Sequence, residues 1–161
     1  MTTSVLFVCL GNICRSPTAE AVFRARAAAA GLDVVADSAG TSDWHIGNPP
    51  YGPAIAAGAA RGYDLRPLRA RQVTSADFDR FDHIIAMDTQ NRADIEALRP
   101  TGSETPVTLC LSHADGVGLT DVPDPYYTRD FEEALDLIEA ATDGLIAQLR
   151  QNVSAVSPKD R

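Results

Sequence analysis

The 161-residue sequence has little lysine, little cysteine and no long apolar segment. Lys159 is the only lysine among the 14 basic residues, while 22 acidic residues bring the formal net charge to −8. Nucleic acids and anionic membranes are bound by clustered lysine and arginine, so this balance argues against either as a partner. A smaller anion is then expected to be held by arginine, whose planar guanidinium suits bidentate recognition of phosphate.

The scarcity of cysteine and of apolar runs excludes further classes of protein. Three cysteines, Cys9, Cys14 and Cys110, do not read as the disulfide framework of a secreted domain. No histidine accompanies them at zinc-finger spacing, so we expect no structural metal. No apolar run approaches the roughly 20 residues of a membrane helix, and residues 1–11 do not resemble a signal peptide. The sequence therefore predicts a cytoplasmic protein without a membrane segment.

The length and the 45% hydrophobic content are those of one ordinary domain with a substantial core. We expect this domain over residues 1–153 and a short polar tail over 154–161. Short apolar runs, typical of buried parallel strands, alternate with helical stretches, which predicts an α/β sandwich. The strands are expected at 5–9, 34–36, 83–87 and 106–111, and the helices at 16–30, 53–61, 75–81, 90–98 and 131–149.

Two helices carry further signals in their sequence. The first is expected to have Ser16 as its N-cap and Pro17 at its first position, and to stop at Gly31. In the last one, large apolar residues recur at helical spacing, which predicts one buried face. That face consists of Phe131, Leu135, Ile138, Leu145 and Leu149, with Ala134 and Ala141 beside them.

The segment between the first strand and the first helix carries the clearest chemical signal. It has the pattern Cys-x5-Arg-Ser, with Cys9 at its start and Arg15 followed by Ser16 at its end. A loop of this length can turn successive backbone N–H groups inward, and with the helix dipole these form an anion site. Gly11 and Asn12 tolerate the left-handed backbone that such a loop needs. Arg15 can fork onto two phosphate oxygens, and the same field would favour the thiolate of Cys9 as a nucleophile.

Attack of a cysteine on a phosphate ester needs an acid that protonates the departing oxygen. Asp124 is the best candidate, because Pro123 and Pro125 flank it and stiffen its loop. Tyr126 and Tyr127 follow directly and are of the kind that lines a pocket. Asp124 is therefore predicted as the general acid.

Each of these residues, taken alone, has a plainer interpretation. A cysteine at a strand end is usually a small apolar filler, an arginine at a helix start usually faces solvent, and Asp124 would be an ordinary turn former. His45, His83 and His113 have no partner at a telling spacing and are interpreted as structural. The combination of strand, Cys-x5-Arg-Ser and helix favours the catalytic interpretation over the plain ones.

At this point the sequence resembles the low-molecular-weight protein tyrosine phosphatases. The resemblance implies a four-stranded parallel sheet with helices on both faces. It also implies hydrolysis of phosphotyrosine through a phosphocysteine intermediate, with no cofactor and no metal. The matching blocks follow the family's order over nearly the whole chain, at residues 5–20, 37–41, 42–44, 70–72, 87–88, 91 and 124–127.

The resemblance assigns a role to each matching residue. Cys9 would be the nucleophile, and Asp124 would act first as acid and then as base for the attacking water. Arg15 and the loop N–H groups would hold the phosphoryl oxygens, while Ser16 would hydrogen-bond the Cys9 thiolate and Asn12 would brace the loop. Aromatic walls suit a phenyl ring, and a deep cleft favours phosphotyrosine over the shorter phosphoserine. The remaining positions are Gly11, Cys14 and Ser38 in the loop and its support, and Leu10, Ile13, Trp44, Tyr126 and Tyr127 as walls of the cleft.

Two positions raise questions of their own. By resemblance Cys14 would form a reversible disulfide with Cys9 under peroxide, and the alternative is a small residue facing the core. Leu68 stands where the family usually has a histidine that hydrogen-bonds toward the loop asparagine. Leucine has no polar group, so Asn12 has to rely on Ser38, on backbone or on water. A looser loop or an altered pH profile is the resulting hypothesis.

Three rival functions remain open. An arsenate reductase of the same fold needs further cysteines on a mobile segment, but residues 82–94 have none and Cys110 lies in a predicted strand. A protein-arginine phosphatase resembles this loop but has threonine at the position of Ile13 and usually phenylalanine at that of Tyr126. A non-catalytic phosphotyrosine-binding scaffold would be indicated by loss of the nucleophile, the arginine or the acid, and all three are present.

The resemblance and the charge also predict partners. Tyrosine-phosphorylated proteins, a cognate tyrosine kinase and phosphate-like anions are expected, for a monomer or weak dimer that binds neither nucleic acid nor membrane. The acidic exterior is expected to favour phosphotyrosine sites with neutral or basic neighbours, and this preference should weaken as salt rises.

Overall fold

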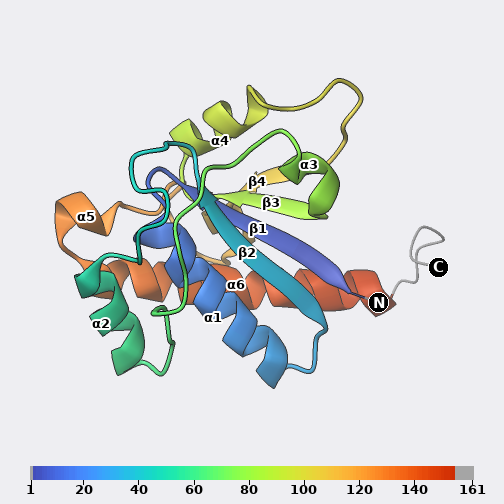
Figure 1. Ribbon diagram of the computed structural model, residues 1–161. Helices are drawn as coiled ribbons and strands as arrows, with labels where there is room; N and C mark the ends of the chain where they lie inside the picture. The colour runs from blue at the N-terminus through green and yellow to red at the C-terminus, as the bar shows by residue number, and fades with distance from the viewer. Residues whose placement is uncertain (1, 155–161) are drawn as a thin grey trace.

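The computed structural model describes residues 2–154, so the predicted polar tail lies, from residue 155 on, outside the described residues. One sheet of four strands runs through the molecule in the order β2-β1-β3-β4, and all three neighbouring pairs are parallel (Figure 1). This architecture confirms the predicted α/β fold with a parallel sheet. The strands are β1 (Thr3–Cys9), β2 (Val34–Gly40), β3 (His83–Ala86) and β4 (Val107–Leu109).

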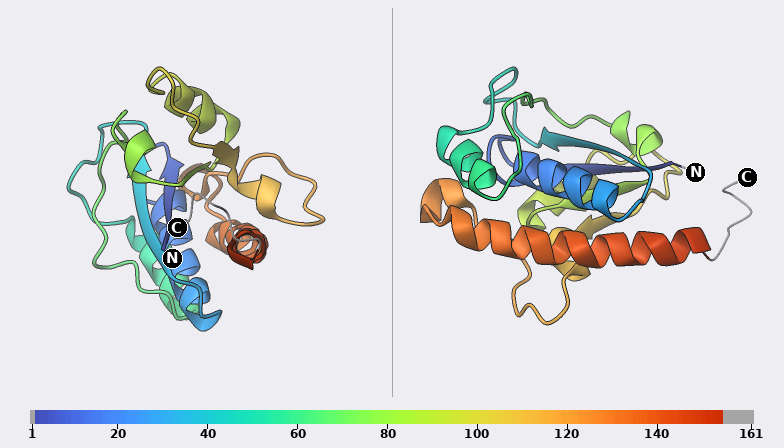
Figure 2. Two further views of the ribbon diagram at one scale, coloured as in Figure 1. Left: turned by 90° about the vertical axis from the view of Figure 1, so that its right-hand side faces the viewer. Right: turned by 90° about the horizontal axis from the view of Figure 1, so that it is seen from below.

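Helices cover both faces of the sheet (Figures 1 and 2). One face packs against α1, α2 and α6, and the other packs against α3 and α4. The bounds of these helices are α1 (Arg15–Ala29), α2 (Gly52–Ala60), α3 (Asp77–Arg80), α4 (Thr89–Glu96) and α6 (Phe131–Ser154).

The central strand β1 is apolar from Val5 to Cys9, where both of its faces are buried. Phe7 and Cys9 belong to the core on the α1 and α6 side, whereas Leu6 and Val8 belong to the core on the α3 and α4 side. Burying each large side chain of this kind contributes about 1.5–3 kcal/mol, and β1 also pairs with a strand on each side. Its carboxyl end, at Cys9, is therefore a rigid platform for whatever follows it.

The longest helix, α6, is amphipathic as its sequence predicts. Leu135, Ile138, Leu145 and Leu149 are buried, and Phe131 packs at the edge of the same core. Within residues 2–154, no helix combines the length and the hydropathy needed to cross a bilayer.

The start of α1 corrects one expectation. The helix begins at Arg15 with Cys14 as its N-cap residue, so Pro17 is its third residue and Ser16 does not cap it. The Ser16 hydroxyl contacts Cys9 Sγ instead, which takes it away from the helix end. The predicted stop holds, because Gly31 follows the helix with a φ of +71°.

The other differences concern short elements. β2 extends to Gly40, well beyond the predicted end at residue 36, because its polar residues make contacts inside the protein. Cys110 does not lie in a strand, since β4 ends at Leu109 and a single 3₁₀ turn, η1 (Cys110–His113), follows. The short helix α5 (Pro125–Thr128) is missed by the periodicity, because four residues are too few to show one.

Candidate active site

The predicted site residues meet at one edge of the sheet, where β1 ends and α1 begins. A cleft of about 160 Å³ opens there. In parallel sheets, ligands bind beyond the carboxyl ends of the strands, and this cleft has that position. Its walls are Cys9, Leu10, Gly11, Ile13, Cys14, Arg15, Trp44, His45, Asp124, Tyr126 and Tyr127.

The loop between β1 and α1 turns sharply at one residue. Asn12 has a φ of +59°, the left-handed conformation that its sequence position predicts. Of the two residues that tolerate a left-handed backbone, only Asn12 adopts it, and Gly11 does not have a positive φ. Its lack of a side chain serves packing instead, because a Cβ atom there would lie 3.1 Å from Cδ2 of His45. The turn at Asn12 directs its backbone N–H toward Cys9 Sγ, 3.2 Å away.

Cys9 lies at the base of the cleft and is 3% exposed. Its Sγ atom has two polar neighbours, the backbone N–H of Asn12 at 3.2 Å and the hydroxyl of Ser16 at 3.0 Å. Both can donate a hydrogen bond to sulfur, and a thiolate accepts such bonds more strongly than a thiol. The base of the cleft is thus arranged to hold a negatively charged sulfur.

The Asn12 side chain is held on all sides. Its Nδ2 donates to Ser16 Oγ at 2.7 Å and to Ser38 Oγ at 3.0 Å, and its Oδ1 accepts from the backbone N–H of Arg71 at 3.0 Å. Because Leu68 stands where the family usually has a histidine, we expected Asn12 to rely on Ser38, on backbone or on water. The structure supplies Ser38 and the Arg71 backbone, and adds Ser16.

Arg15 reaches into the cleft from the first turn of α1. Its Nη1 donates to Asp88 Oδ2 at 2.7 Å and to the carbonyl of Val122 at 2.9 Å, while its Nη2 lies 3.5 Å from Asp124 Oδ2. Burial lowers the pKa of Arg15, but the negative charges of Cys9, Asp124 and Asp88 outweigh burial and raise it above its ordinary value. The guanidinium therefore stays charged, and its Nη1 contacts fix its orientation.

Sequence reasoning gave Asp88 no role, although it lay in one of the matching blocks. Asp88 follows β3 and is the N-cap of α4, where its Oδ1 accepts from the backbone N–H of Asn91 at 2.7 Å. Its other oxygen holds Arg15. A carboxylate directly after a strand that pairs with β1 was the signal that could have identified it, since those strand ends share one edge.

Asp124 stands at the mouth of the cleft as the N-cap of α5. Its Oδ1 accepts from the backbone N–H of Tyr126 at 3.0 Å, and its Oδ2 faces Arg15. The side chain is 23% exposed, so the Oδ2 atom can meet a ligand that enters from solvent. Asp124 thus caps a short helix, much as an ordinary turn-forming aspartate would, and its second carboxylate oxygen is also placed for acid catalysis.

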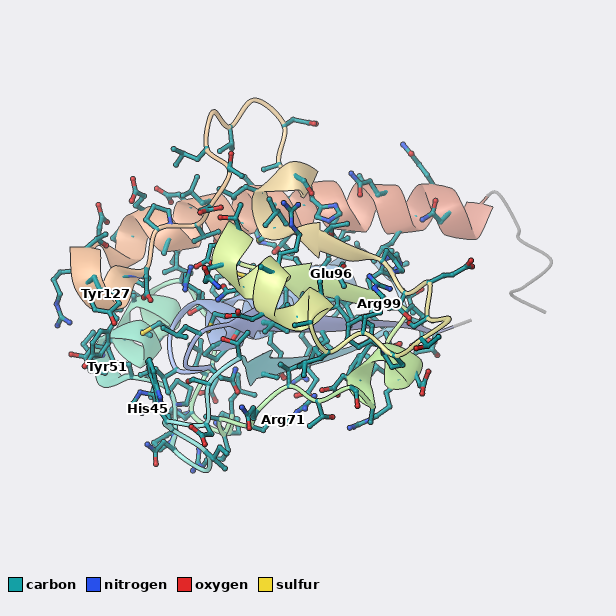
Figure 3. All side chains as sticks on the ribbon, turned by 90° about the horizontal axis from the view of Figure 1, so that it is seen from above. His45, Tyr51, Arg71, Glu96, Arg99 and Tyr127 are labelled. Carbon is teal, nitrogen blue, oxygen red and sulfur yellow. The ribbon has the colours of Figure 1, made fainter. Side chains whose placement is uncertain are left out.

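The rim of the cleft is aromatic. Trp44, Tyr126 and Tyr127 are exposed, and Tyr51 packs against Tyr126 with ring centroids 5.2 Å apart. Figure 3 shows His45, Tyr51 and Tyr127 at the same end of the molecule. His45 was interpreted as structural, but the structure places it on the cleft wall, and its position next to Trp44 was the available signal.

The two other cysteines differ in their relation to the cleft. Cys14 lines it, and burial followed by the negative charges of Cys9 and Asp124 raises the pKa of Cys14 to about 12. Burial raises the pKa of Cys110 to about 12 as well, so that thiol stays protonated in the core. A cysteine that exchanges a disulfide with Cys9 has to lie next to the cleft, and Cys110 is not part of the cleft lining.

Comparison with known proteins identifies relatives over nearly the full length. The family profile "Low molecular weight phosphotyrosine protein phosphatase" matches residues 4–155. A low molecular weight protein-tyrosine-phosphatase of Streptomyces coelicolor is 48% identical over 160 residues, which cover 95% of this chain and 97% of that protein. The phosphatase YfkJ of Bacillus subtilis is 45% identical over 150 residues, which cover 92% of this chain and 96% of that protein.

Solved structures agree with the sequence relatives. The crystal structure of YfkJ superposes with a TM-score of 0.89 at 43% identity, covering 94% of this chain and 97% of that chain. A crystal structure of a Drosophila arginine phosphatase also superposes, with a TM-score of 0.85 at 30% identity over 90% of this chain and 96% of that chain.

Proposed function

The chain belongs to the low-molecular-weight phosphotyrosine protein phosphatases and is a protein-tyrosine-phosphatase, and from that premise we propose how its own residues carry out the reaction. Cys9 is the nucleophile, Arg15 binds the phosphoryl group, and Asp124 is the general acid and base. The observation that carries this proposal is the placement of Cys9 Sγ, which meets two hydrogen-bond donors at the base of a cleft shared with Arg15 and Asp124.

The first step transfers the phosphoryl group to the enzyme. The Cys9 thiolate attacks phosphorus, an S–P bond forms, and the bond between phosphorus and the tyrosine oxygen breaks. Asp124 gives its proton to the departing phenol oxygen, so that no phenolate has to leave. Arg15 and the inward N–H groups of the loop stabilise the charge spread over the other phosphoryl oxygens.

The second step releases phosphate. Asp124, now a carboxylate, takes a proton from water as that water attacks phosphorus. The S–P bond breaks and returns the Cys9 thiolate, which the Asn12 N–H and the Ser16 hydroxyl stabilise as a leaving group. The Asp88 contact keeps the Arg15 guanidinium in one orientation through both steps.

The preferred substrate in this proposal is phosphotyrosine in cytoplasmic proteins that a cognate tyrosine kinase phosphorylates. Aromatic side chains at the rim can stack on the phenyl ring of the substrate. Ile13 and Tyr126 differ from the threonine and phenylalanine of the arginine-phosphatase branch, which favours phosphotyrosine over phosphoarginine. Phosphate release from paired phosphotyrosine and phosphoarginine peptides tests this choice, and faster release from phosphoarginine would contradict it.

The nucleophile is tested with p-nitrophenyl phosphate. We expect turnover by the unaltered protein, no measurable turnover by Cys9→Ser, and near-parental turnover by the matched variant Cys110→Ala. Because Cys110 is buried away from the cleft lining, this variant controls for loss of a cysteine as such. Activity of Cys9→Ser would show that another residue is the nucleophile, and absence of phosphate release by the unaltered protein would contradict the proposed function.

A redox role for Cys14 is part of the same proposal. Peroxide converts the Cys9 thiolate to a sulfenic acid, the Cys14 thiolate attacks that sulfur, and hydroxide leaves as the disulfide forms. Both cysteines line the cleft, and their charges are coupled closely enough for Cys9 to raise the pKa of Cys14. The disulfide would protect Cys9 from irreversible oxidation until a thiol reduces it.

A further inference from the structure

A chain of buried polar groups leads from Cys9 away from the cleft and ends at a carboxylate. Its members come from β1, the loop that follows it, α1 and β2. Its members are between 0% and 4% exposed, so bulk water cannot readily replace any of their contacts. The groups in order are Cys9 Sγ, Ser16 Oγ, Asn12 Nδ2, Ser38 Oγ and Glu20 Oε1.

The direction of these hydrogen bonds follows from Asn12, the middle member of the series. The backbone N–H of Arg71 can only donate, so the Asn12 atom that faces it at 3.0 Å has to be the amide oxygen. The amide nitrogen of Asn12 therefore faces the two serines, at 2.7 Å from Ser16 Oγ and 3.0 Å from Ser38 Oγ. An amide nitrogen can only donate, so both hydroxyl oxygens accept from Asn12.

Each serine is then left with one hydrogen to donate elsewhere. Ser38 lies 2.7 Å from Glu20 Oε1, and a carboxylate oxygen can only accept, so the Ser38 hydrogen points at Glu20. Ser16 lies 3.0 Å from Cys9 Sγ and 3.3 Å from the carbonyl of Ala39. When Cys9 is a thiolate, the charged sulfur is the stronger acceptor, and the Ser16 hydrogen points at it.

We propose that Glu20 is a positioning residue for the reaction, because it orients the hydrogen bonds that end at the Cys9 sulfur. By accepting from Ser38 it keeps the Ser38 oxygen free to accept from Asn12. Asn12 is thereby held in the orientation that makes Ser16 a donor to Cys9. This inference rests on the proposed function, since it takes Cys9 as the nucleophile.

The role requires a group that accepts hydrogen bonds on both of its sides. Glu20 Oε2 accepts from Arg24 Nη2 at 2.7 Å, and Arg24 also holds the carbonyl of Ala36 at 2.6 Å. A glutamine would have to present its amide nitrogen either to Arg24, whose guanidinium has no acceptor, or to Ser38, which would then have to turn its hydrogen away from residue 20. Two charged groups face Glu20, Arg24 from α1 and Asp37 from β2.

The charge of Glu20 is sensitive to this surrounding. Burial raises the pKa of Glu20 above its ordinary value, and Asp37 adds to the rise, while the hydrogen bonds of Ser38 and Arg24 oppose it. The hydrogen bonds from Ser38 and Arg24 therefore favour the carboxylate form of Glu20 although it is buried. We call the series of hydrogen bonds from Glu20 to Cys9 the relay.

The experiment compares Glu20→Gln with the unaltered protein. We expect kcat to fall about tenfold with KM unchanged, since only part of one hydrogen bond to the charged sulfur is lost. The pH dependence of Cys9 alkylation by iodoacetamide should move to higher pH. The matched control is Glu96→Gln, which removes an acid paired with Arg99 away from the cleft and should match the unaltered protein in both readouts (Figure 3).

A double-mutant cycle with Ser38→Ala separates the relay from a general structural effect. Ser38→Ala breaks the relay but leaves the ion pair of Glu20 and Arg24 in place, so Glu20→Gln should cost nothing further in that background. The same tenfold loss in both backgrounds, or parental kcat and alkylation in Glu20→Gln, would overturn the proposal.

Two further outcomes keep the result decisive. If Glu20→Gln does not fold, Ser38→Ala alone carries the test, and a lower kcat at unchanged KM supports the relay while a parental kcat and alkylation profile refute it. Alkylation needs no turnover, so the relay is tested even if the unaltered protein fails to hydrolyse p-nitrophenyl phosphate. Such a failure would contradict the proposed function and not the relay.

Discussion

The inner wall and the outer rim of the cleft are built in opposite ways. On the inner wall, Asn12 and Ser16 are buried, and each polar atom of the Asn12 side chain has a hydrogen-bond partner. On the rim, Trp44 is 66% exposed and Tyr127 is 69% exposed. The inner groups lie on the end of β1, the start of α1 and the short loop between them, whereas the rim lies on a separate loop and on the short helix α5.

This difference matches the two tasks of a phosphatase that acts on proteins. The phosphoryl group is the same in every substrate, so the groups that bind and transfer it gain from being fixed in one geometry. The polypeptide around a phosphotyrosine varies, and exposed side chains on loops can adapt to it. Changes to the inner wall should therefore affect kcat, and changes to the rim should affect KM.

The largest effect is expected from Asp124→Ala, at the point where wall and rim meet. Loss of the general acid should lower kcat about 10²- to 10⁴-fold for phenyl phosphate, whose leaving group needs a proton. The loss should be much smaller for p-nitrophenyl phosphate, whose leaving group is a weak base. Rates with the two esters measure this difference, and Asp115→Ala, an exposed acid in the same connecting segment, is the control. Equal losses for the two esters would contradict an acid role.

Gly40→Ala should break the inner wall without removing any of its polar groups. A Cβ atom at Gly40 would lie 2.7 Å from the carbonyl oxygen of Leu10 and 3.1 Å from the backbone nitrogen of Asn12. Backbone atoms cannot rotate away as a side chain does, so the loop has to shift, and a displacement of about 1 Å can cost roughly 100-fold in rate. Kinetics with p-nitrophenyl phosphate measure the loss, and Gly52→Ala, where an added Cβ meets nothing within 4 Å, should keep parental rates. Parental kcat in Gly40→Ala would show that the wall tolerates displacement.

The pH dependence of disulfide formation between Cys14 and Cys9 tests the redox role of Cys14 in the inner wall. Because burial raises the pKa of the Cys14 thiol well above its ordinary value, its thiolate fraction, and with it the rate of disulfide closure, should rise steadily with pH between about pH 7 and 9, by up to about tenfold per pH unit. Activity recovered by a thiol reductant after a peroxide pulse at each pH reports closure. Cys110→Ser should recover like the unaltered protein and Cys14→Ser should not. Equal recovery in Cys14→Ser would refute the redox role.

Trp44→Ala tests the rim. We expect KM for a phosphotyrosine peptide to rise about two- to tenfold, the range that the loss of one aromatic contact of about 0.5–1.5 kcal/mol allows, with kcat unchanged. The thermal unfolding midpoint should stay in place, because this side chain is exposed. Ile46→Ala, which removes an exposed apolar group that does not line the cleft, is the control. A fall in kcat at constant KM would mean that the rim takes part in the chemical step.

The sequence predicted what is local along the chain. Cys9, Arg15 and the left-handed turn at Asn12 lie within one loop, so their spacing alone indicated an anion site. The alternation of apolar runs and helical stretches was sufficient for the α/β class. Even the roles expected for Asn12 and Ser38 needed only a pattern of matching blocks.

What escaped prediction depends on contacts between distant segments. Asp88 holds Arg15 only because β3 pairs with β1 and brings the two strand ends together. Gly40 matters because β2 passes within reach of the loop backbone, which no spacing in the sequence reveals. Glu20 lies one turn beyond Ser16 on α1, yet it takes part in the relay through Ser38 on another element. Long-range packing decides all three.

The smallest effect is expected from Leu68→His, which restores the histidine of the family pattern. The amide oxygen of Asn12 already accepts from Arg71, and its nitrogen already donates to Ser16 and Ser38. Because each polar atom of the Asn12 side chain already has a partner, an added imidazole is not needed to hold it, so we expect kcat and the pH profile of kcat/KM to change less than about twofold. Leu68→Asn, a polar substitution too short to act as the histidine would, separates loss of leucine packing from gain of an imidazole. A marked shift in the pH profile of Leu68→His that is absent in Leu68→Asn would contradict this expectation. It would mean that the loop, and with it the inner wall of the cleft, is less rigid than its hydrogen bonds indicate.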